Sequence, residues 1–144
     1  MKIVGTIFFA VLSLVVVLSA SADRPDYNIH IEKAYSYATS ARQKNGVVFM
    51  DIVNRMPMPD RLIAAYSDIA ENVELHTHVM EGNVMKMRQV EHYDIPGGET
   101  FSLNPHGAHI MLMGLKSPLE KDQKFRLTLD FENHDDIIVN VTVQ

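Results

Sequence analysis

The sequence predicts an all-β domain, a sandwich or barrel with Greek-key connections, and three observations support this fold class. From residue 27 onward, apolar residues recur at every second position in short runs, which is the period of half-buried strands. Clusters of Gly, Pro, Asn and Asp separate these runs. No stretch keeps a helical period over three turns, so the domain is expected to contain strands only.

The first expected strands cover residues 27–37 and 46–53, and Lys44-Asn45-Gly46 marks the turn between them. A run of two prolines and an aspartate over residues 56–60 separates the second strand from a third at 62–66. The alternating segments 73–80 and 84–90 follow, joined by Gly82-Asn83. This pair suits a two-residue hairpin turn, which requires positive φ angles.

The later strands are separated by equally clear turn signals. Ile95-Pro96-Gly97-Gly98 precedes an expected strand at 100–103, and the turn sequence at 104–107 precedes one at 108–113. Two further alternating runs, 125–131 and 137–143, are divided by the Asn- and Asp-rich segment 133–136. Many short strands in a chain of this length are typical of a single β-sandwich or barrel.

The N-terminal residues predict a secretory signal peptide over 1–22, followed by one domain over 23–144. Lys2 is followed by an uncharged apolar run over 3–18 and by small residues over 19–22. A membrane-spanning helix needs about 20 apolar residues, and this run is shorter. We therefore expect an exported protein with no membrane span after cleavage, and an uncleaved anchor is the alternative. Because no cysteine follows the run, no lipid anchor is expected.

Composition excludes several classes of site. The 144 residues contain no cysteine, which removes disulfides, thiolate metal sites and thiol nucleophiles. A net charge of −5 argues against a nucleic-acid partner, because binding to phosphate needs a basic surface. An exported chain without disulfides must also bury a real hydrophobic core.

Histidines and methionines gather on one face of the predicted hairpin. A turn at Gly82-Asn83 places Met80 opposite Met85 and His78 opposite Met87. Since side chains alternate along strands, these residues and His76 share one face. A second stripe follows later in the chain, where His109, Met111 and Met113 alternate along one strand.

Imidazole and thioether groups together favour copper. Thioether sulfur is a soft, neutral donor that suits Cu(I), whereas zinc, calcium and magnesium make little use of it. Methionine also serves as adaptable core packing, so each of these residues taken singly has a structural alternative. Two stripes of both residue types are harder to explain by packing alone.

The sequence resembles the PCuAC family, the periplasmic copper chaperones for the binuclear copper A site of cytochrome oxidase. That family carries His, ten residues, Met, twenty-one residues, His, any residue, Met, and this chain matches at every step. The matching residues are His76, Met87, His109 and Met111. The segments 73–77, 84–88, 95–98 and 109–119 also resemble the family.

The resemblance implies a cupredoxin-like Greek-key β-sandwich that is not an enzyme. It implies that those four side chains bind Cu(I) at an exposed site. The chaperone would deliver the ion to a copper-accepting protein such as cytochrome oxidase subunit II, with a thiol-containing copper assembly protein as a further partner. His78 and His106 depart from the family pattern. Either imidazole would add a ligand that favours Cu(II) more than a thioether does, and the alternative is that both are solvent-exposed residues without a role.

Four other functions are weighed against this one. A general periplasmic copper-binding or storage protein would use the same residues. A zinc-dependent hydrolase would use His76, His78 and either His106 or His109, but has no need of the methionines. An electron-transfer cupredoxin would need the absent cysteine thiolate. In a purely structural sandwich, His76 and His109 would be buried and far apart.

Overall fold

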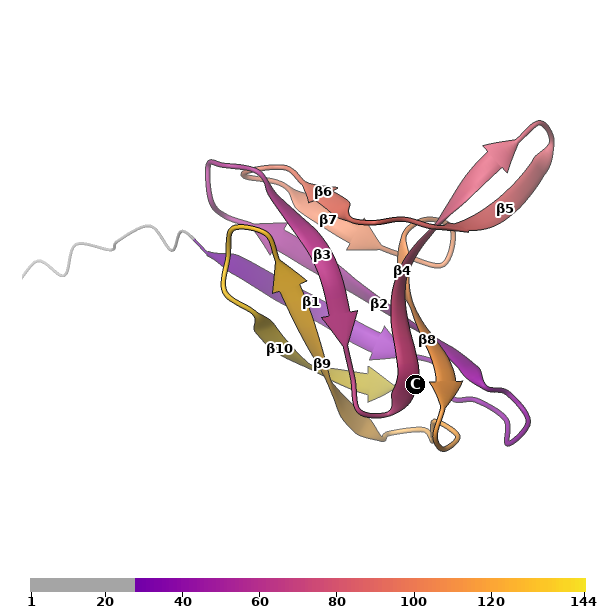
Figure 1. Ribbon diagram of the computed structural model, residues 1–144. Coiled ribbons are helices and arrows are strands. Elements are labelled where there is room, and N and C mark those ends of the chain that lie inside the picture. Colours follow the sequence, from indigo (N-terminus) through magenta and orange to yellow (C-terminus); the bar gives the residue numbers. More distant parts are fainter. Residues whose placement is uncertain (1–27) are drawn as a thin grey trace, which may run out of the picture.

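The computed structural model describes residues 28–144, whose regular elements are ten strands (Figure 1). The signal peptide predicted over 1–22 lies outside the described residues. The strands are β1 (Ile29–Ser36), β2 (Asn45–Asn54), β3 (Asp60–Tyr66), β4 (Ala70–Glu81), β5 (Val84–Gln89), β6 (Tyr93–Ile95), β7 (Thr100–Leu103), β8 (His109–Leu115), β9 (Lys124–Phe131) and β10 (Ile137–Val143). Each of the nine predicted strands is present, and the sequence analysis missed only the three-residue strand β6.

The strands follow one hydrogen-bonded path, in the order β5-β4-β8-β2-β1-β10-β9-β3-β6, and β7 pairs with β2. Only β1 and β10 are parallel among the described strands. The path folds back on itself, so that β3 and β9 lie in front of β1 and β2 in Figure 1. The all-β prediction is therefore confirmed.

The hydrophobic core lies between these two layers. Almost every long strand contributes the side chains of one of its faces to this core. Its fully buried members include Ile52 from β2, Leu62 from β3, Ile110 from β8, Leu127 from β9 and Val141 from β10. Burying one such side chain contributes about 1.5–3 kcal/mol, so this interior can hold the fold together without disulfides. The outward-facing residues of β4 and β8 are thus available for a site.

One part of the molecule extends beyond the two layers. The ladder between β4 and β8 ends at the pair His76–His109, and from there β4 continues in pairing with β5 alone. Figure 1 shows this two-stranded arm, residues 77–89, projecting away from the body. Gly82 turns the arm with a φ of +64°, which agrees with a hairpin turn that has glycine at its first central position. The predicted register is confirmed, with Met80 opposite Met85.

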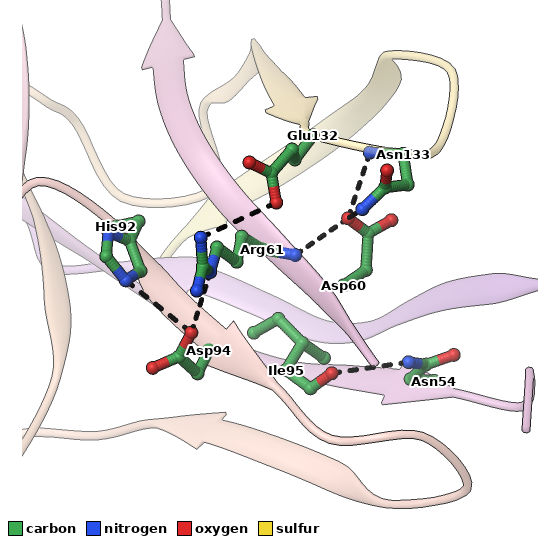
Figure 2. Close-up of polar contacts among 8 residues, drawn as sticks. All are labelled: Asn54, Asp60, Arg61, His92, Asp94, Ile95, Glu132 and Asn133. Atoms are coloured by element: carbon green, nitrogen blue, oxygen red, sulfur yellow. Dashed lines mark hydrogen bonds and ion pairs between the residues drawn. The ribbon is translucent and has the colours of Figure 1, made fainter. Parts of the chain in front are cut away.

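At the β3–β6 edge, a polar cluster holds the short strand β6 in place (Figure 2). Arg61 on β3 pairs with Asp94 on β6 at 3.0 Å and with Glu132 at 3.8 Å. Asn54 Nδ2 donates to the Ile95 carbonyl at 3.4 Å. These contacts fix β6 against β3 and the end of β2. The position of β6 matters because its first residue, Tyr93, contacts the backbone of the candidate site described below from the core side.

Candidate metal centre

His76 and His109 face each other across neighbouring strands. They are the last directly paired residues of the β4–β8 ladder, and their ring centroids lie 5.9 Å apart. The adjacent residues Leu75 and Ile110 point into the core, so both imidazoles lie on the outer face of the sheet. The His109 residue is only 2% exposed, and the His76 side chain is 13% exposed.

Each imidazole has one nitrogen tied to an acceptor. His109 Nδ1 lies 3.0 Å from the Gly107 carbonyl oxygen, and His76 Nε2 lies 2.8 Å from Glu74 Oε2. A carbonyl and a carboxylate only accept hydrogen bonds, so these two ring nitrogens carry the protons. When each ring is neutral, as it must be to bind a metal ion, the other nitrogen keeps its lone pair.

Those lone-pair nitrogens are buried and have no partner. His76 Nδ1 and His109 Nε2 are among the buried polar atoms that lack a hydrogen bond in the described structure. An unsatisfied buried acceptor costs about 1–3 kcal/mol, so native proteins rarely keep two of them close together without a purpose. A histidine ligand characteristically gives its second nitrogen to a carboxylate or carbonyl while the first binds a metal, and both residues have this arrangement.

Burial also favours the neutral form of His109. Desolvation is the largest influence and lowers the pKa of His109 below its ordinary value, and the positive charges that His78 and His76 can carry act in the same direction. The hydrogen bond to Gly107 opposes this shift. A neutral imidazole is the form that binds metal ions.

The two thioethers of the predicted set lie on the same outer face. Met111 follows His109 on β8 and pairs with Glu74, while Met87 on β5 pairs with His78. Both methionines are therefore diagonal neighbours of His76, at about 7–8 Å between backbones. Met87 is 43% exposed and Met111 is half-buried.

Two expectations from the sequence are corrected by this arrangement. An exposed site was expected, but His109 is buried and the His76 side chain is only 13% exposed, and Met87 is the most open member of the set. The purely structural alternative placed His76 and His109 far apart, and it is wrong because they are directly paired.

His78 also belongs to this face. Its ring centroid lies 5.0 Å from that of His109, closer than the His76 ring, and its Nδ1 lies 3.3 Å from the Gly107 oxygen. With Met87 and His109, it lines a hollow of about 90 Å³. His106 lies exposed in the preceding loop, and its backbone N–H donates to Asn104 Oδ1 at 3.0 Å.

Two further methionines of the predicted stripes, Met113 and Met85, lie farther from the two imidazoles along their strands. Met113 is half-buried on the same face, opposite Asn72, and Met85 lies near the turn of the arm. Within residues 28–144, no three side chains of the His, Cys, Asp and Glu types form a group that could hold a metal ion. The mixed set of imidazoles and thioethers is the candidate centre.

Tyr93 supports both histidines from the core side, and the sequence analysis did not find it. Its hydroxyl lies 2.6 Å from the His76 carbonyl oxygen and 2.7 Å from the His109 carbonyl oxygen. These carbonyls stand where β4 and β8 separate, at the end of their ladder. Burial raises the pKa of Tyr93 well above its usual range, so the hydroxyl stays a donor.

Tyr93→Phe is expected to lower the free energy of unfolding by about 1–3 kcal/mol, because the buried His109 carbonyl and the partly buried His76 carbonyl lose the one hydroxyl that they share. Chemical denaturation of the metal-free protein measures this change. Tyr66→Phe is the control, since Tyr66 is 56% exposed and its loss should change the stability little. Equal stabilities of the Tyr93 variant and the wild type would show that the hydroxyl does not secure the strand ends.

Comparison with solved structures defines the class of this domain. The copper-bound PCuAC domain from PmoF2 has a TM-score of 0.70 at 22% identity and covers 81% of this chain and 92% of that one. The solution structure of CuI-DR1885 from Deinococcus radiodurans has a TM-score of 0.64 at 28% identity, covering 79% of this chain and 76% of that one. The fold is that of the cupredoxin-like PCuAC domains, as the sequence resemblance predicted.

The family follows from sequence comparison. The model described as "Putative lipoprotein LpqE-like" matches residues 29–143, so the chain belongs to the LpqE-like family. The "Putative lipoprotein Lxx21020" of Leifsonia xyli is 33% identical over 134 residues, which are 90% of this chain and 80% of that protein. An uncharacterized protein of Rickettsia prowazekii is 28% identical over 100 residues, which are 69% of this chain and 55% of that protein.

Residues 28–144 contain no helix with the length and hydrophobicity of a membrane span.

Proposed function

We propose that this protein is a copper chaperone that binds Cu(I) through His76, Met87, His109 and Met111. One observation carries the proposal: two buried, unpartnered imidazole nitrogens belong to directly paired residues of neighbouring strands. Both thioethers share the face of these imidazoles. The related solution structure of CuI-DR1885, the Cu(I) form of that protein, supports the choice of ion.

The chemistry of the donors agrees with this ion. Two thioethers and two neutral imidazoles are soft or borderline ligands without charge, a set that suits Cu(I). Glu74 and Gly107 orient the imidazoles through their second nitrogens, which raises the ligands' basicity. His78, beside His109, offers a further imidazole for Cu(II).

Unequal exposure of the donors favours transfer over storage. Met87 is 43% exposed, so an incoming ligand from a partner can replace this thioether before it reaches the buried imidazoles. Each thioether is a weak ligand, and stepwise exchange therefore proceeds without freeing the ion. In this proposal the protein is a carrier rather than an enzyme, and a general copper-storage role is the second candidate.

The recipient and the compartment belong to the proposal as well. By resemblance to the PCuAC chaperones, the ion goes to the copper A site in cytochrome oxidase subunit II, with a thiol-containing assembly protein as a further partner. The signal sequence predicted over 1–22 and the lipoprotein descriptions of the relatives support export, and we propose that the protein acts in the periplasm.

Competition against a chromophoric Cu(I) chelator under anaerobic conditions tests the proposed function. The wild type should remove one equivalent of Cu(I) from the chelator, and the double variant His76→Ala/Met87→Leu should compete far less well. The control His134→Ala/Met58→Leu changes the same residue types away from the outer face of β4, β5 and β8. Unchanged Cu(I) affinity in the first double variant would overturn the assignment.

A further inference from the structure

We propose that Met80 and Met85, near the turn of the β4–β5 arm, form a second and transient Cu(I)-binding site through which the ion reaches the main centre. The two residues are directly paired across β4 and β5. They are 61% and 54% exposed, respectively. The inference rests on the proposed function, because it concerns the path to the same centre.

Packing does not account for this pair. Every residue of β5 is exposed, so no neighbouring layer covers this strand of the arm. Directly opposite side chains in a strand pair have Cβ atoms about 4.5–5.5 Å apart, a separation across which two flexible thioethers can share one ion. Exposed apolar groups on an uncovered two-stranded ribbon add little stability, so packing in a hydrophobic core does not explain the presence of Met80 and Met85.

The opposite face of the arm differs in chemistry. Lys86 Nζ pairs with Glu81 Oε2 at 2.7 Å, and Arg88 Nε pairs with Glu81 Oε1 at 3.0 Å. These charged groups keep the arm soluble while the thioethers gather on the other face. The soft donors are therefore separated from the hard ones within a single hairpin.

Successive donor pairs lead from the arm to the main centre. Met80–Met85 is followed along the ladders by His78–Met87 and then by His76–His109, all on one face. Each step spans two residues of a strand, about 7 Å. Exposure falls along this route, from 61% for Met80 to 43% for Met87 and 2% for His109.

The donor types change in the same order. The first pair offers two sulfurs, the second one sulfur and one nitrogen, and the third two nitrogens with Met111 beside them. Copper stays Cu(I) throughout, because every step replaces one neutral lone pair by another and moves no electron. A weak, exposed sulfur pair captures the ion, and the buried imidazoles retain it.

Methionine methyl resonances test the site directly. The full chain, labelled with carbon-13 at the methionine methyl groups, is titrated anaerobically with Cu(I). The first equivalent should shift Met87 and Met111, and the second should shift Met80 and Met85. In Met80→Leu/Met85→Leu, the first phase should stay and the second should vanish. Resonances of Met80 and Met85 that stay in place at two equivalents overturn the second site.

Kinetics test the role of the site. The rate of Cu(I) uptake from a bicinchoninate complex should fall about tenfold in Met80→Leu/Met85→Leu, while the equilibrium affinity of the main centre stays the same. Val84→Leu, on the opposite face of the arm, is the control and should leave the rate unchanged. An unchanged uptake rate in the double variant overturns the proposed path.

The NMR titration also separates this inference from the proposed function on which it rests. If the resonances of Met87 and Met111 do not shift at the first equivalent of Cu(I), the proposed function fails, whatever the resonances of Met80 and Met85 do.

Discussion

His109→Ala is expected to lower the Cu(I) affinity about 100-fold or more, the largest effect of any single substitution in this chain. Loss of an orienting partner alone typically costs 10–100-fold in metal affinity, and this change removes a ligand. The buried ring also occupies the centre of the site, between His76, His78 and Phe49. Alanine therefore removes one of the two buried, unpartnered nitrogens of the proposed ligand set.

Anaerobic competition with a chromophoric chelator measures this affinity. His106→Ala is the matched control, because it removes an exposed imidazole from the adjoining loop and should leave the affinity within about twofold, as surface substitutions usually do. Circular dichroism must show that the His109 variant is folded. A folded His109→Ala protein that binds Cu(I) as tightly as the wild type would contradict the proposed ligand set.

Glu74→Ala is expected to lower the Cu(I) affinity about 10–100-fold without removing any proposed ligand. The carboxylate accepts a hydrogen bond from His76 Nε2–H, with Oε2 and Nε2 2.8 Å apart, and so orients the ring with Nδ1 toward the ion. Without this acceptor, the proton can occupy either ring nitrogen and the ring can rotate. Glu74→Gln keeps a neutral acceptor, so its affinity should lie between those of Glu74→Ala and the wild type.

The same titration, carried out on the three Glu74 proteins and on Glu99→Ala, separates orientation from charge. Glu99 is an exposed carboxylate before β7, and its removal changes the net charge equally. If Glu74→Ala and Glu99→Ala lose the same small amount of affinity, the effect is one of general electrostatics and the positioning role of Glu74 fails.

The arm could be predicted from the sequence because its information is local. Gly82-Asn83 fixes the turn, and the turn fixes which residues of β4 and β5 are opposite each other. The alternation of His and Met then decides the shared face. The pairing of Met80 with Met85 and of His78 with Met87 follows from these two facts alone.

The pairing of β4 with β8 could not be derived in the same way. More than thirty residues separate His76 from His109, and only the family resemblance joined them before the structure did. The strand β6 was missed because three residues carry no measurable period, and with it the role of Tyr93. Burial of the imidazoles was missed because the aromatic neighbour Phe49 comes from β2, far away in sequence.

X-ray absorption at the copper edge of the Cu(I)-loaded protein tests the central claim most directly, because it counts the sulfur and nitrogen neighbours of the ion. The proposed set of His76, Met87, His109 and Met111 predicts two sulfur and two nitrogen ligands. Replacement of Met87 and Met111 by leucine, in a chain that also carries Met80→Leu/Met85→Leu, should remove the sulfur contribution at one equivalent of copper. A spectrum of the wild type that contains nitrogen or oxygen neighbours only would contradict the proposed centre.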